Sequence, residues 1–136
     1  MLKLVTPTRA LYESECDMAI LRSVEGEFGV LPGHESFTTI LSPGKLRVFN
    51  EEKEDLVAVL GGFVVIDDNK VTILSDQAEL PEEIDLERAQ AARERAENRL
   101  KGTATADDVN LKRAELALRR ALVRIDISSY TLLKGK

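Results

Sequence analysis

The segment VVIDDNKVTILSDQAELPEEIDLERAQAARERAENRL (residues 64–100) contains two different hydrophobic patterns, and the change between them decides the fold. Before Pro81, apolar residues occur in short alternating runs that turn residues separate, a pattern typical of β-strands. From Asp85 onward, strong helix formers follow one another without a break. The sequence therefore predicts a β domain over residues 1–82 and a helical domain over residues 83–136.

The first domain is predicted to be an antiparallel sandwich or barrel, because several short strands alternate with turns. The run VVIDDNKVTIL indicates a hairpin, and Gly61-Gly62 between two apolar runs indicates a bulge or bend rather than a ligand contact. The predicted strands are 2–6, 17–23, 36–41, 45–49, 55–60, 62–66 and 70–74.

The second domain is predicted to be a two-helix antiparallel hairpin. Asp85 caps the first helix, and the second helix runs to about Ile127. The facing apolar stripes are Ala89, Ala92, Ala96 and Leu100 on the first helix, and Leu111, Ala114, Leu118, Ala121 and Ile125 on the second. Because alanine burial contributes little and two helices enclose no core, the hairpin must rest on its own β domain, on a partner protein or on a ligand.

Charge is distributed unevenly along the 136 residues, although the net charge is only −5. Residues 1–83 carry 7 basic and 16 acidic residues, whereas residues 84–136 carry 12 basic and 8 acidic ones. A basic segment points to nucleic acid, to an acidic partner or to a phosphate ligand. The small surplus and the few aromatic residues argue against nucleic acid.

The remaining composition indicates a soluble protein that is not exported. No apolar run approaches the roughly 18 residues that cross a bilayer, and the start of the chain lacks the hydrophobic region of a signal peptide. A single cysteine, Cys16, forms no internal disulfide and lacks the spacing of a metal site. These features fit a reducing compartment and predict no metal.

Charged residues form a row on each of the two helices, and these rows can be interpreted in two ways. They are either a solvated helix face, with Asp85 as a cap paired to Arg88, or an anion site in which arginine forks bind phosphate oxygens. Because exposed ion pairs on helices are common and weak, spacing alone favours the solvated face. The rows are Asp85, Arg88, Arg95 and Arg99 on the first helix and Arg113, Arg120 and Arg124 on the second.

The sequence predicts no catalytic residue. His34, the only histidine, lies on a Pro-Gly turn without a nucleophile arrangement, and such a residue is more often an interface residue than a base. Neither a phosphate-cradling glycine loop nor a zinc spacing occurs, so an enzyme is the least favoured function.

Five stretches together resemble one family, the epsilon subunit of bacterial F-type rotary ATP synthases. Their order and spacing match that family over nearly the whole chain, and the glycine motifs GEFGVLPGH and GGF are specific in combination. The stretches are VTPTRALYES (5–14), EGEFGVLPGHESFTTIL (25–41), LGGFVVIDDNKVTILSDQAEL (60–80), IDLERAQAARERAENRL (84–100) and KRAELALRRALVRI (112–125).

The resemblance implies an α+β protein: an N-terminal β-sandwich of about ten strands, followed by the C-terminal hairpin. It also implies a non-catalytic rotor subunit at the cytoplasmic face of the bacterial cell membrane, which contacts the membrane only through the complex. The sandwich would contact the gamma stalk and the rotor c-ring, with His34 at the rotor. The hairpin would fold down or extend beside the catalytic beta and alpha subunits and inhibit ATP hydrolysis, with Arg113, Arg119, Arg120 and Arg124 facing an acidic segment of beta.

Some members of that family bind ATP at the folded-down hairpin as a regulatory ligand, and the resemblance implies the same here. The remaining alternative is a structural coupling subunit that senses no nucleotide. The positions that match the family's ATP-binding residues are Glu79, Ile84, Asp85, Arg88, Ala89, Arg95, Arg120 and Arg124.

Overall fold

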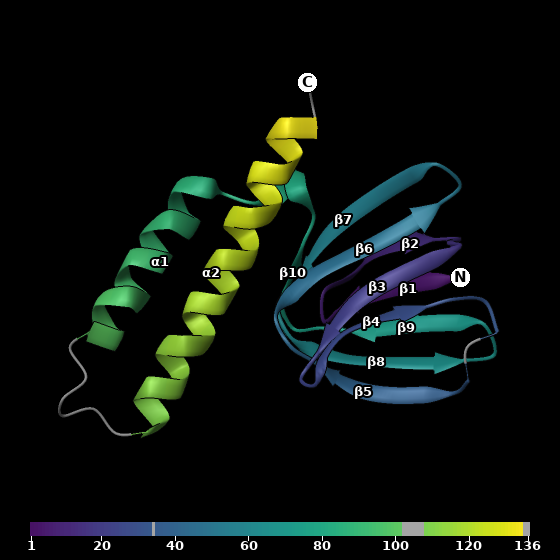
Figure 1. The fold of residues 1–136 in the computed structure, drawn as a ribbon, viewed down its shortest axis with the longest axis horizontal. Helices are drawn as coiled ribbons and strands as arrows, with labels where there is room; N and C mark the ends of the chain where they lie inside the picture. Colours follow the sequence, from purple (N-terminus) through teal and green to yellow (C-terminus); the bar gives the residue numbers. More distant parts are fainter. Residues whose placement is uncertain (34, 102–107, 135–136) are drawn as a thin grey trace. The chain divides into compact units, whose positions relative to one another are not determined.

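The computed structural model describes residues 1–33, 35–101 and 108–134. The chain divides into two compact units, Met1–Pro81 and Glu82–Lys136. The first unit contains the β-strands and the second contains the two long helices (Figure 1). The predicted fold class, a β-sandwich followed by a helical hairpin, is confirmed.

The described part of the first unit forms ten strands. In chain order they are β1 (Leu2–Thr6), β2 (Arg9–Ser14), β3 (Met18–Ser23), β4 (Gly26–Val30), β5 (Phe37–Leu41), β6 (Gly44–Asn50), β7 (Lys53–Val59), β8 (Gly62–Asp67), β9 (Lys70–Leu74) and β10 (Ala78–Glu79).

The strands form one sheet in the order β10-β7-β6-β3-β5-β8-β9-β1-β2, and β4 pairs with β3. All the pairs that the structure describes are antiparallel except β1 with β9, which are parallel. Between β3 and β5 the register contains a single pair, Ser23 with Leu41. The sheet therefore bends at this point, so that its two halves face each other as the layers of a sandwich.

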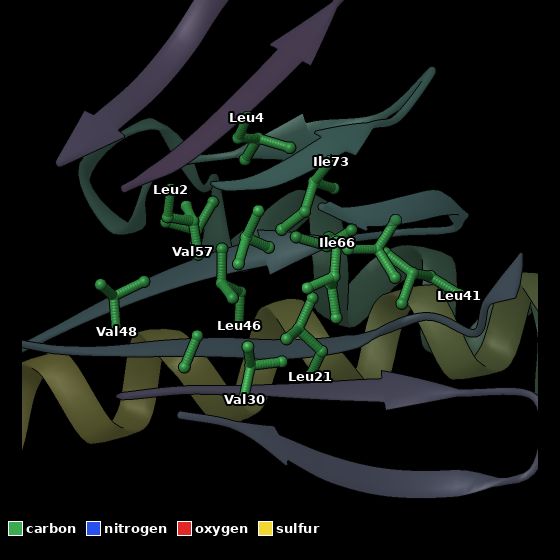
Figure 2. Packing of buried hydrophobic residues seen from close by; sticks show 14 residues of the cluster. Leu2, Leu4, Leu21, Val30, Leu41, Leu46, Val48, Val57, Ile66 and Ile73 are labelled. Atoms are coloured by element: carbon green, nitrogen blue, oxygen red, sulfur yellow. The ribbon is translucent and has the colours of Figure 1, made fainter. Parts of the chain in front are cut away.

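The core lies between these layers, where side chains of alternating residues meet (Figure 2). On β1, for example, Leu2 and Leu4 are fully buried while Lys3 is exposed, as the two-residue period of a strand requires. The cluster consists of Leu2, Leu4, Ala19, Leu21, Val30, Leu41, Leu46, Val48, Val57, Val59, Val64, Ile66, Val71 and Ile73.

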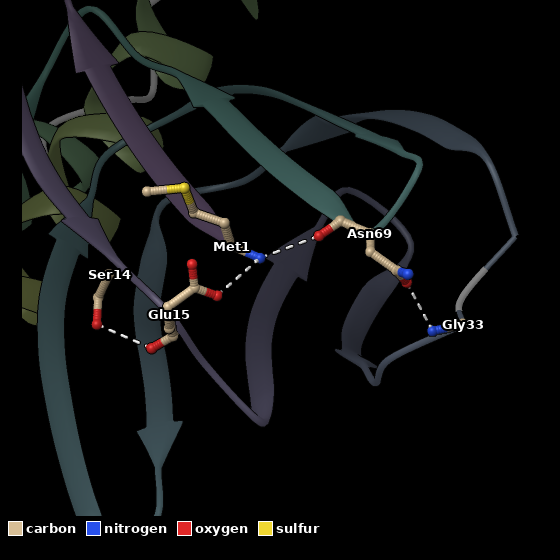
Figure 3. Close-up of polar contacts among 5 residues, drawn as sticks. All are labelled: Met1, Ser14, Glu15, Gly33 and Asn69. Atoms are coloured by element: carbon tan, nitrogen blue, oxygen red, sulfur yellow. Dashed lines mark hydrogen bonds and ion pairs between the residues drawn. The ribbon is translucent and has the colours of Figure 1, made fainter.

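The predicted β8–β9 hairpin is confirmed, and its turn has the backbone that a tight hairpin needs. Asp68 and Asn69 both have positive φ, 49° and 60°, which matches the right-handed twist of the flanking strands. Asn69 also accepts a hydrogen bond at Oδ1 from the N–H of Gly33 (2.9 Å), and its backbone oxygen accepts one from the amino group of Met1 (3.0 Å; Figure 3). The turn thus fixes the loop that follows β4.

The predicted bend at Gly61-Gly62 is also present. Gly61 and Gly62 have φ values of 118° and 121°, in the region that favours glycine. Ser75 donates a hydrogen bond to the Gly61 oxygen at 2.6 Å. At Gly62 the chain passes so close to the Leu74 carbonyl that a Cβ would collide with it, so this glycine has a packing role.

The second unit starts with the short 3₁₀ helix η1 (Pro81–Glu83), which is followed by α1 (Leu86–Lys101) and α2 (Asp108–Lys134). The two helices pack side by side and run antiparallel (Figure 1). The prediction that the second helix ends near Ile127 is wrong, because α2 continues for about two more turns. No glycine or proline interrupts the sequence from Asp108 to Lys134, so nothing local stops the helix at Ile127.

Candidate functional site

Asp85 begins the first helix as its N-cap, as the sequence predicts. Its Oδ1 accepts a hydrogen bond from the backbone N–H of Arg88 (3.1 Å), and its backbone oxygen accepts one from the N–H of Ala89 (3.0 Å). Among the described residues, the side chains of Asp85 and Arg88 form no ion pair. The cap explains Asp85, but it leaves the exposed guanidinium group of Arg88 available to another partner.

The two long helices of the hairpin contact each other through small residues. Ala89 and Ala96 on α1 and Ala114 and Ala121 on α2 are 0–3% exposed, and each pair is seven residues apart. Ala96 is 5 residues before the end of α1 and Ala114 is 6 residues after the start of α2, while Ala89 and Ala121 are 12 and 13 residues from those ends. In an antiparallel pair this places Ala96 about level with Ala114, and Ala89 about level with Ala121. Four alanines therefore form the seam of the hairpin.

An arginine directly precedes each of these four seam alanines. In an α-helix, neighbouring side chains are rotated by about 100° around the axis, so each arginine lies about 100° from the alanine that follows it. A two-fold axis across the seam relates the two antiparallel helices. The same rotation on both helices therefore places the four arginines on one side of the hairpin. We call the four arginines that precede the seam alanines the arginine face: Arg88, Arg95, Arg113 and Arg120. Arg99, one turn beyond Arg95, lies on the same side of α1.

The residues of the arginine face differ in their surroundings. Arg88, Arg95 and Arg113 are exposed, and none of them has an ion-pair partner among the residues that the structure describes. Arg120 is half-buried, and its Nε is shielded from solvent without a hydrogen-bond partner in that part of the chain. A shielded donor of this kind is uncommon and favours an acceptor from outside the hairpin.

The other ATP-site candidates are distributed unequally around the arginine face. Arg124 lies one turn beyond Arg120 on the same side of α2, and it already has an interaction in the structure. Ile84 and Asp85 precede α1 at the same open end of the hairpin, and Ala89 is in the seam. Glu79 belongs to the first unit, where it pairs with Ala58 on β10 and β7. His34 lies outside the described residues.

The four residues expected to contact the beta subunit do not lie on one side of α2. Arg113, Arg120 and Arg124 share the side of the arginine face, whereas Arg119 is rotated by about 100° from Arg120 and points away from the seam. Arg119 is exposed. Helical spacing had already separated Arg119 from the row of Arg113, Arg120 and Arg124, and the structure adds that the row lies beside the buried alanines.

An exposed apolar row on the sandwich was not predicted from the sequence. Ile40 pairs with Phe63, Phe63 with Leu74, and Leu74 with Val5, across four neighbouring strands. All four point away from the core, and Ile40 and Phe63 are 62% and 44% exposed. A contiguous apolar row of this kind is typical of a protein interface. The alternation of inward and outward residues along each strand could have predicted this row, because Ile40 and Phe63 occupy outward positions.

The described residues contain no group of three or more histidine, cysteine, aspartate or glutamate side chains arranged to hold a metal ion. In the described residues, no helix has the length and apolar character needed to cross a membrane.

Family models match both units of the chain. The model for the ATP synthase delta/epsilon chain β-sandwich domain matches residues 1–81, and the model for the long α-helix domain of the same chain matches residues 82–129. Among curated proteins, the ATP synthase epsilon chain of Halalkalibacterium halodurans is 48% identical over 91% of this chain and 92% of its own length. That of Alkalihalophilus pseudofirmus is 47% identical with the same coverage.

Solved structures give the same result. The chain is similar to a chain of the Euglena gracilis mitochondrial ATP synthase OSCP/F1/c-ring structure, with a TM-score of 0.76, 31% identity, and coverage of 92% of this chain and 78% of the other. A chain of the Tetrahymena thermophila central stalk and c-ring structure shares the fold, with a TM-score of 0.65, 15% identity, and coverage of 93% and 94%. Since both units match in order and over most of their length, the protein belongs to the family of ATP synthase epsilon chains.

Proposed function

We propose that this chain is a non-catalytic central-stalk subunit whose hairpin inhibits ATP hydrolysis and binds ATP when folded down. The arginine face is the observation that carries the proposal. Its four basic side chains lie on one side of a hairpin that is joined mainly through alanines. The same surface can therefore bind an anionic ligand in one state and an acidic protein segment in another.

The alanine seam supports a mobile hairpin. A buried alanine removes only about one methyl group from water, which contributes less than 1 kcal/mol. Because the fully buried residues of α1 are two alanines, this helix gains little from burial, so the position of the hairpin depends on what else it binds. Such a hairpin can exchange partners without unfolding the sandwich, which has its own core of fourteen apolar residues.

Inhibition would follow from contact between basic residues of α2 and an acidic segment of the catalytic beta subunit. The candidates are Arg113, Arg119, Arg120 and Arg124. Arg119 lies on the other side of the helix from the arginine face, so an acidic segment that contacts all four must wrap around α2. Because exposed charge pairs are screened over about 8–10 Å at moderate salt, inhibition should weaken as ionic strength rises.

ATP would bind at the open end of the hairpin. Arg88, Arg95, Arg120 and Arg124 would bind the phosphates, while Ile84 and one oxygen of Asp85 would contact the nucleoside. Ala89, which is buried in the seam, would keep α1 in position beneath the ligand. Asp85 uses Oδ1 for the helix cap, and among the described residues Oδ2 makes no hydrogen bond. Glu79, on β10, is the remaining candidate contact for ATP. ATP shifts the hairpin only if it binds the folded-down state more tightly than the extended one.

The sandwich would hold the subunit in the complex. The apolar row Val5, Leu74, Phe63 and Ile40 is suited to the gamma stalk, because an exposed apolar surface on a folded domain gains most from a protein partner. His34 would lie toward the c-ring. In a bacterial cell these partners would place the chain at the cytoplasmic face of the membrane.

Titration of the full chain with ATP, followed by calorimetry and by thermal melting, tests the ligand. We expect heat of binding and a melting temperature that rises with ATP concentration, and we expect Arg88→Ala to lose both. The matched control is Arg93→Ala, because Arg93 pairs with Glu97 on α1 and lies off the arginine face. A wild type that binds no ATP at millimolar concentration would support the alternative, a structural subunit without nucleotide sensing.

Hydrolysis assays of the reconstituted complex test inhibition. A variant with Arg113, Arg119, Arg120 and Arg124 all changed to glutamine should inhibit less than the wild type. Equal inhibition by both proteins at low salt would contradict the electrostatic contact.

A further inference from the structure

We infer that the cavity beside the N-terminus of the sandwich binds a small amphiphilic amine, with the apolar part of the ligand inside and its ammonium group next to Asp17. The cavity has a volume of about 240 Å³. Its ligand class is an alkylamine or arylalkylamine that carries one positive charge. The inference goes beyond the proposed function, because it concerns neither the helical hairpin nor the apolar row of the sandwich.

The inner wall of the cavity is apolar and belongs to the core of the sandwich. It consists of the buried side chains of Val30 on β4, Ile66 on β8 and Val71 on β9. These strands come from both halves of the bent sheet, so the cavity is an open end of the space between the two layers. Since an apolar cavity of about 150 Å³ holds benzene, this one has room for a ring or chain of about six to eight carbon atoms.

The outer wall of the cavity is the loop that follows β4, and hydrogen bonds hold this wall in place. Leu31 and Pro32 line the cavity from the loop. The side chain of Asn69 accepts a hydrogen bond from the N–H of Gly33, and its backbone oxygen accepts one from the amino group of Met1 (Figure 3). The cavity is therefore formed before a ligand binds, and Leu31, which is 59% exposed, leaves apolar surface at its mouth for a ligand to cover.

The polar side of the cavity carries more negative than positive charge. Glu15 and Asp17, between β2 and β3, both line it, and so does the amino group of Met1. That amino group lies 3.7 Å from Oε2 of Glu15, so these two charges offset each other. Asp17 accepts a hydrogen bond at Oδ2 from the N–H of Glu51 (2.7 Å), and within the described chain its Oδ1 accepts none. This oxygen is available to an ammonium group at the mouth of the cavity.

Cys16, between these two carboxylates, senses the same charges. Burial raises the pKa of the Cys16 thiol above its ordinary value, the N-terminal amino group lowers the pKa, and the carboxylates of Asp17 and Glu15 raise it again. The carboxylates thus act on a half-buried group that lines the cavity. They would stabilise a bound cation and repel a bound anion of the same shape.

The test is a titration of the isotope-labelled full chain with three six-carbon probes, followed by amide chemical shifts in NMR spectra. The probes are hexylammonium, hexanol and hexanoate, at neutral pH and fixed ionic strength. We expect shifts at Val30, Ile66 and Val71, which line the cavity. Hexylammonium should bind about fivefold more tightly than hexanol and about tenfold or more above hexanoate, because only the head group differs.

Variants separate the charge of the site from its shape. Asp17→Asn keeps an oxygen for the Glu51 N–H and should weaken hexylammonium by about fivefold while leaving hexanol within about twofold. Glu13→Gln is the matched control, because it removes the same charge from an exposed residue of β2 outside the cavity. Cys16→Leu places a larger side chain in the cavity and should weaken hexylammonium and hexanol alike, whereas Cys16→Ala should preserve both. Thermal melting without ligand shows whether each variant is folded.

Three results would overturn the inference, and the first two come from proteins with the cavity intact. Hexanoate binding as tightly as hexylammonium would show that the carboxylates do not select the head group. Shifts confined to residues outside the cavity, or no shifts with any probe, would show that the cavity holds no such ligand. Equal weakening of hexylammonium by Asp17→Asn and Glu13→Gln would show that only net charge matters. ATP binding by the hairpin is independent of all three results.

Discussion

The hydroxyl of Tyr12 on β2 donates a hydrogen bond to Oδ2 of Asp55 on β7, with an O–O distance of 2.7 Å. β2 is the last strand at one end of the sheet, and β7 lies next to the last strand at the other end. The bond therefore joins the two ends of the sheet by side chains, where no backbone ladder connects them. Between β3 and β5, in contrast, the two halves of the sheet are connected by a single backbone pair.

Replacement of Tyr12 by phenylalanine should lower the free energy of unfolding of the sandwich by about 1 kcal/mol, because the ring remains and only the hydrogen bond is lost. The bond is partly open to solvent, so the loss should not exceed this. Chemical denaturation followed by circular dichroism measures it. Asp55→Asn is the companion variant, and an unchanged midpoint in both variants would show that the link is not stabilising.

The same bond should respond to alkaline pH. Burial, and then the hydrogen bond to Asp55, raise the pKa of Tyr12 from 10.0 to about 12. Because the folded state holds this proton more tightly than the unfolded chain, the contribution is fully present below pH 10 and is lost as pH rises toward 12. Denaturation of the wild type and Tyr12→Phe across this range should show their difference in stability shrinking above about pH 10. A difference that stays constant to about pH 11.5 would contradict the assignment.

Asn69 combines a positive φ with a side-chain contact, and substitutions can separate the two (Figure 3). Asn69→Gly keeps the turn but loses the acceptor for the Gly33 N–H, which should cost about 1 kcal/mol. Asn69→Ala also places a Cβ residue at a φ of 60° and should cost about 1 kcal/mol more. Asp68→Gly is the control, because it keeps the turn and the Gly33 contact. Equal melting temperatures for the glycine and alanine variants of Asn69 would contradict this order.

Gly62 should be the least replaceable glycine of the β8 region. A Cβ there would collide with the backbone oxygen of Leu74, and its φ of 121° also disfavours a side chain, so Gly62→Ala should cost about 2–4 kcal/mol. Gly61 has a similar φ of 118°, but a Cβ would meet no atom within 4 Å. Gly61→Ala should therefore cost clearly less, and thermal melting of both variants tests the difference.

The strands that the sequence predicted are those with a buried face and a regular alternation. β1 and β9 were predicted with their observed bounds, 2–6 and 70–74, because each has core residues at every second position. Three strands were missed. On β2, Arg9 and Ala10 are both exposed, β4 contains two glycines in five residues, and β10 has only two residues, so none presents a clear apolar face.

Only the part of the candidate site that lies on a single helix could be predicted from the sequence. Helical spacing showed the charged row on the first helix, because that row depends on one element alone. The arginine face combines two helices, and its composition depends on which alanines meet at the seam. Arg113 was accordingly placed in the charged row of the second helix and among the beta contacts, but it was not matched to an alanine of the seam. Tyr12 and Asp55, 43 residues apart, could not be paired from the sequence, because no local pattern links β2 to β7.

The alanine seam should not tolerate a larger side chain. Ala121 is 0% exposed, and a leucine there would force α1 and α2 apart at a cost of about 1–3 kcal/mol, borne by the hairpin and not by the sandwich. Hydrogen exchange by mass spectrometry distinguishes the two units: in Ala121→Leu, amides of α1 and α2 should exchange faster while those of β8 and β9 stay protected. The neighbouring Leu122 is 42% exposed, so Leu122→Ala is a matched change outside the seam and should alter exchange little. Leucine at position 121 would also move Arg120 away from Arg88, because both arginines are next to seam alanines. ATP binding should therefore fall in Ala121→Leu and persist in Leu122→Ala. Unchanged exchange and unchanged ATP binding in Ala121→Leu would mean that the four alanines do not set the position of the arginines.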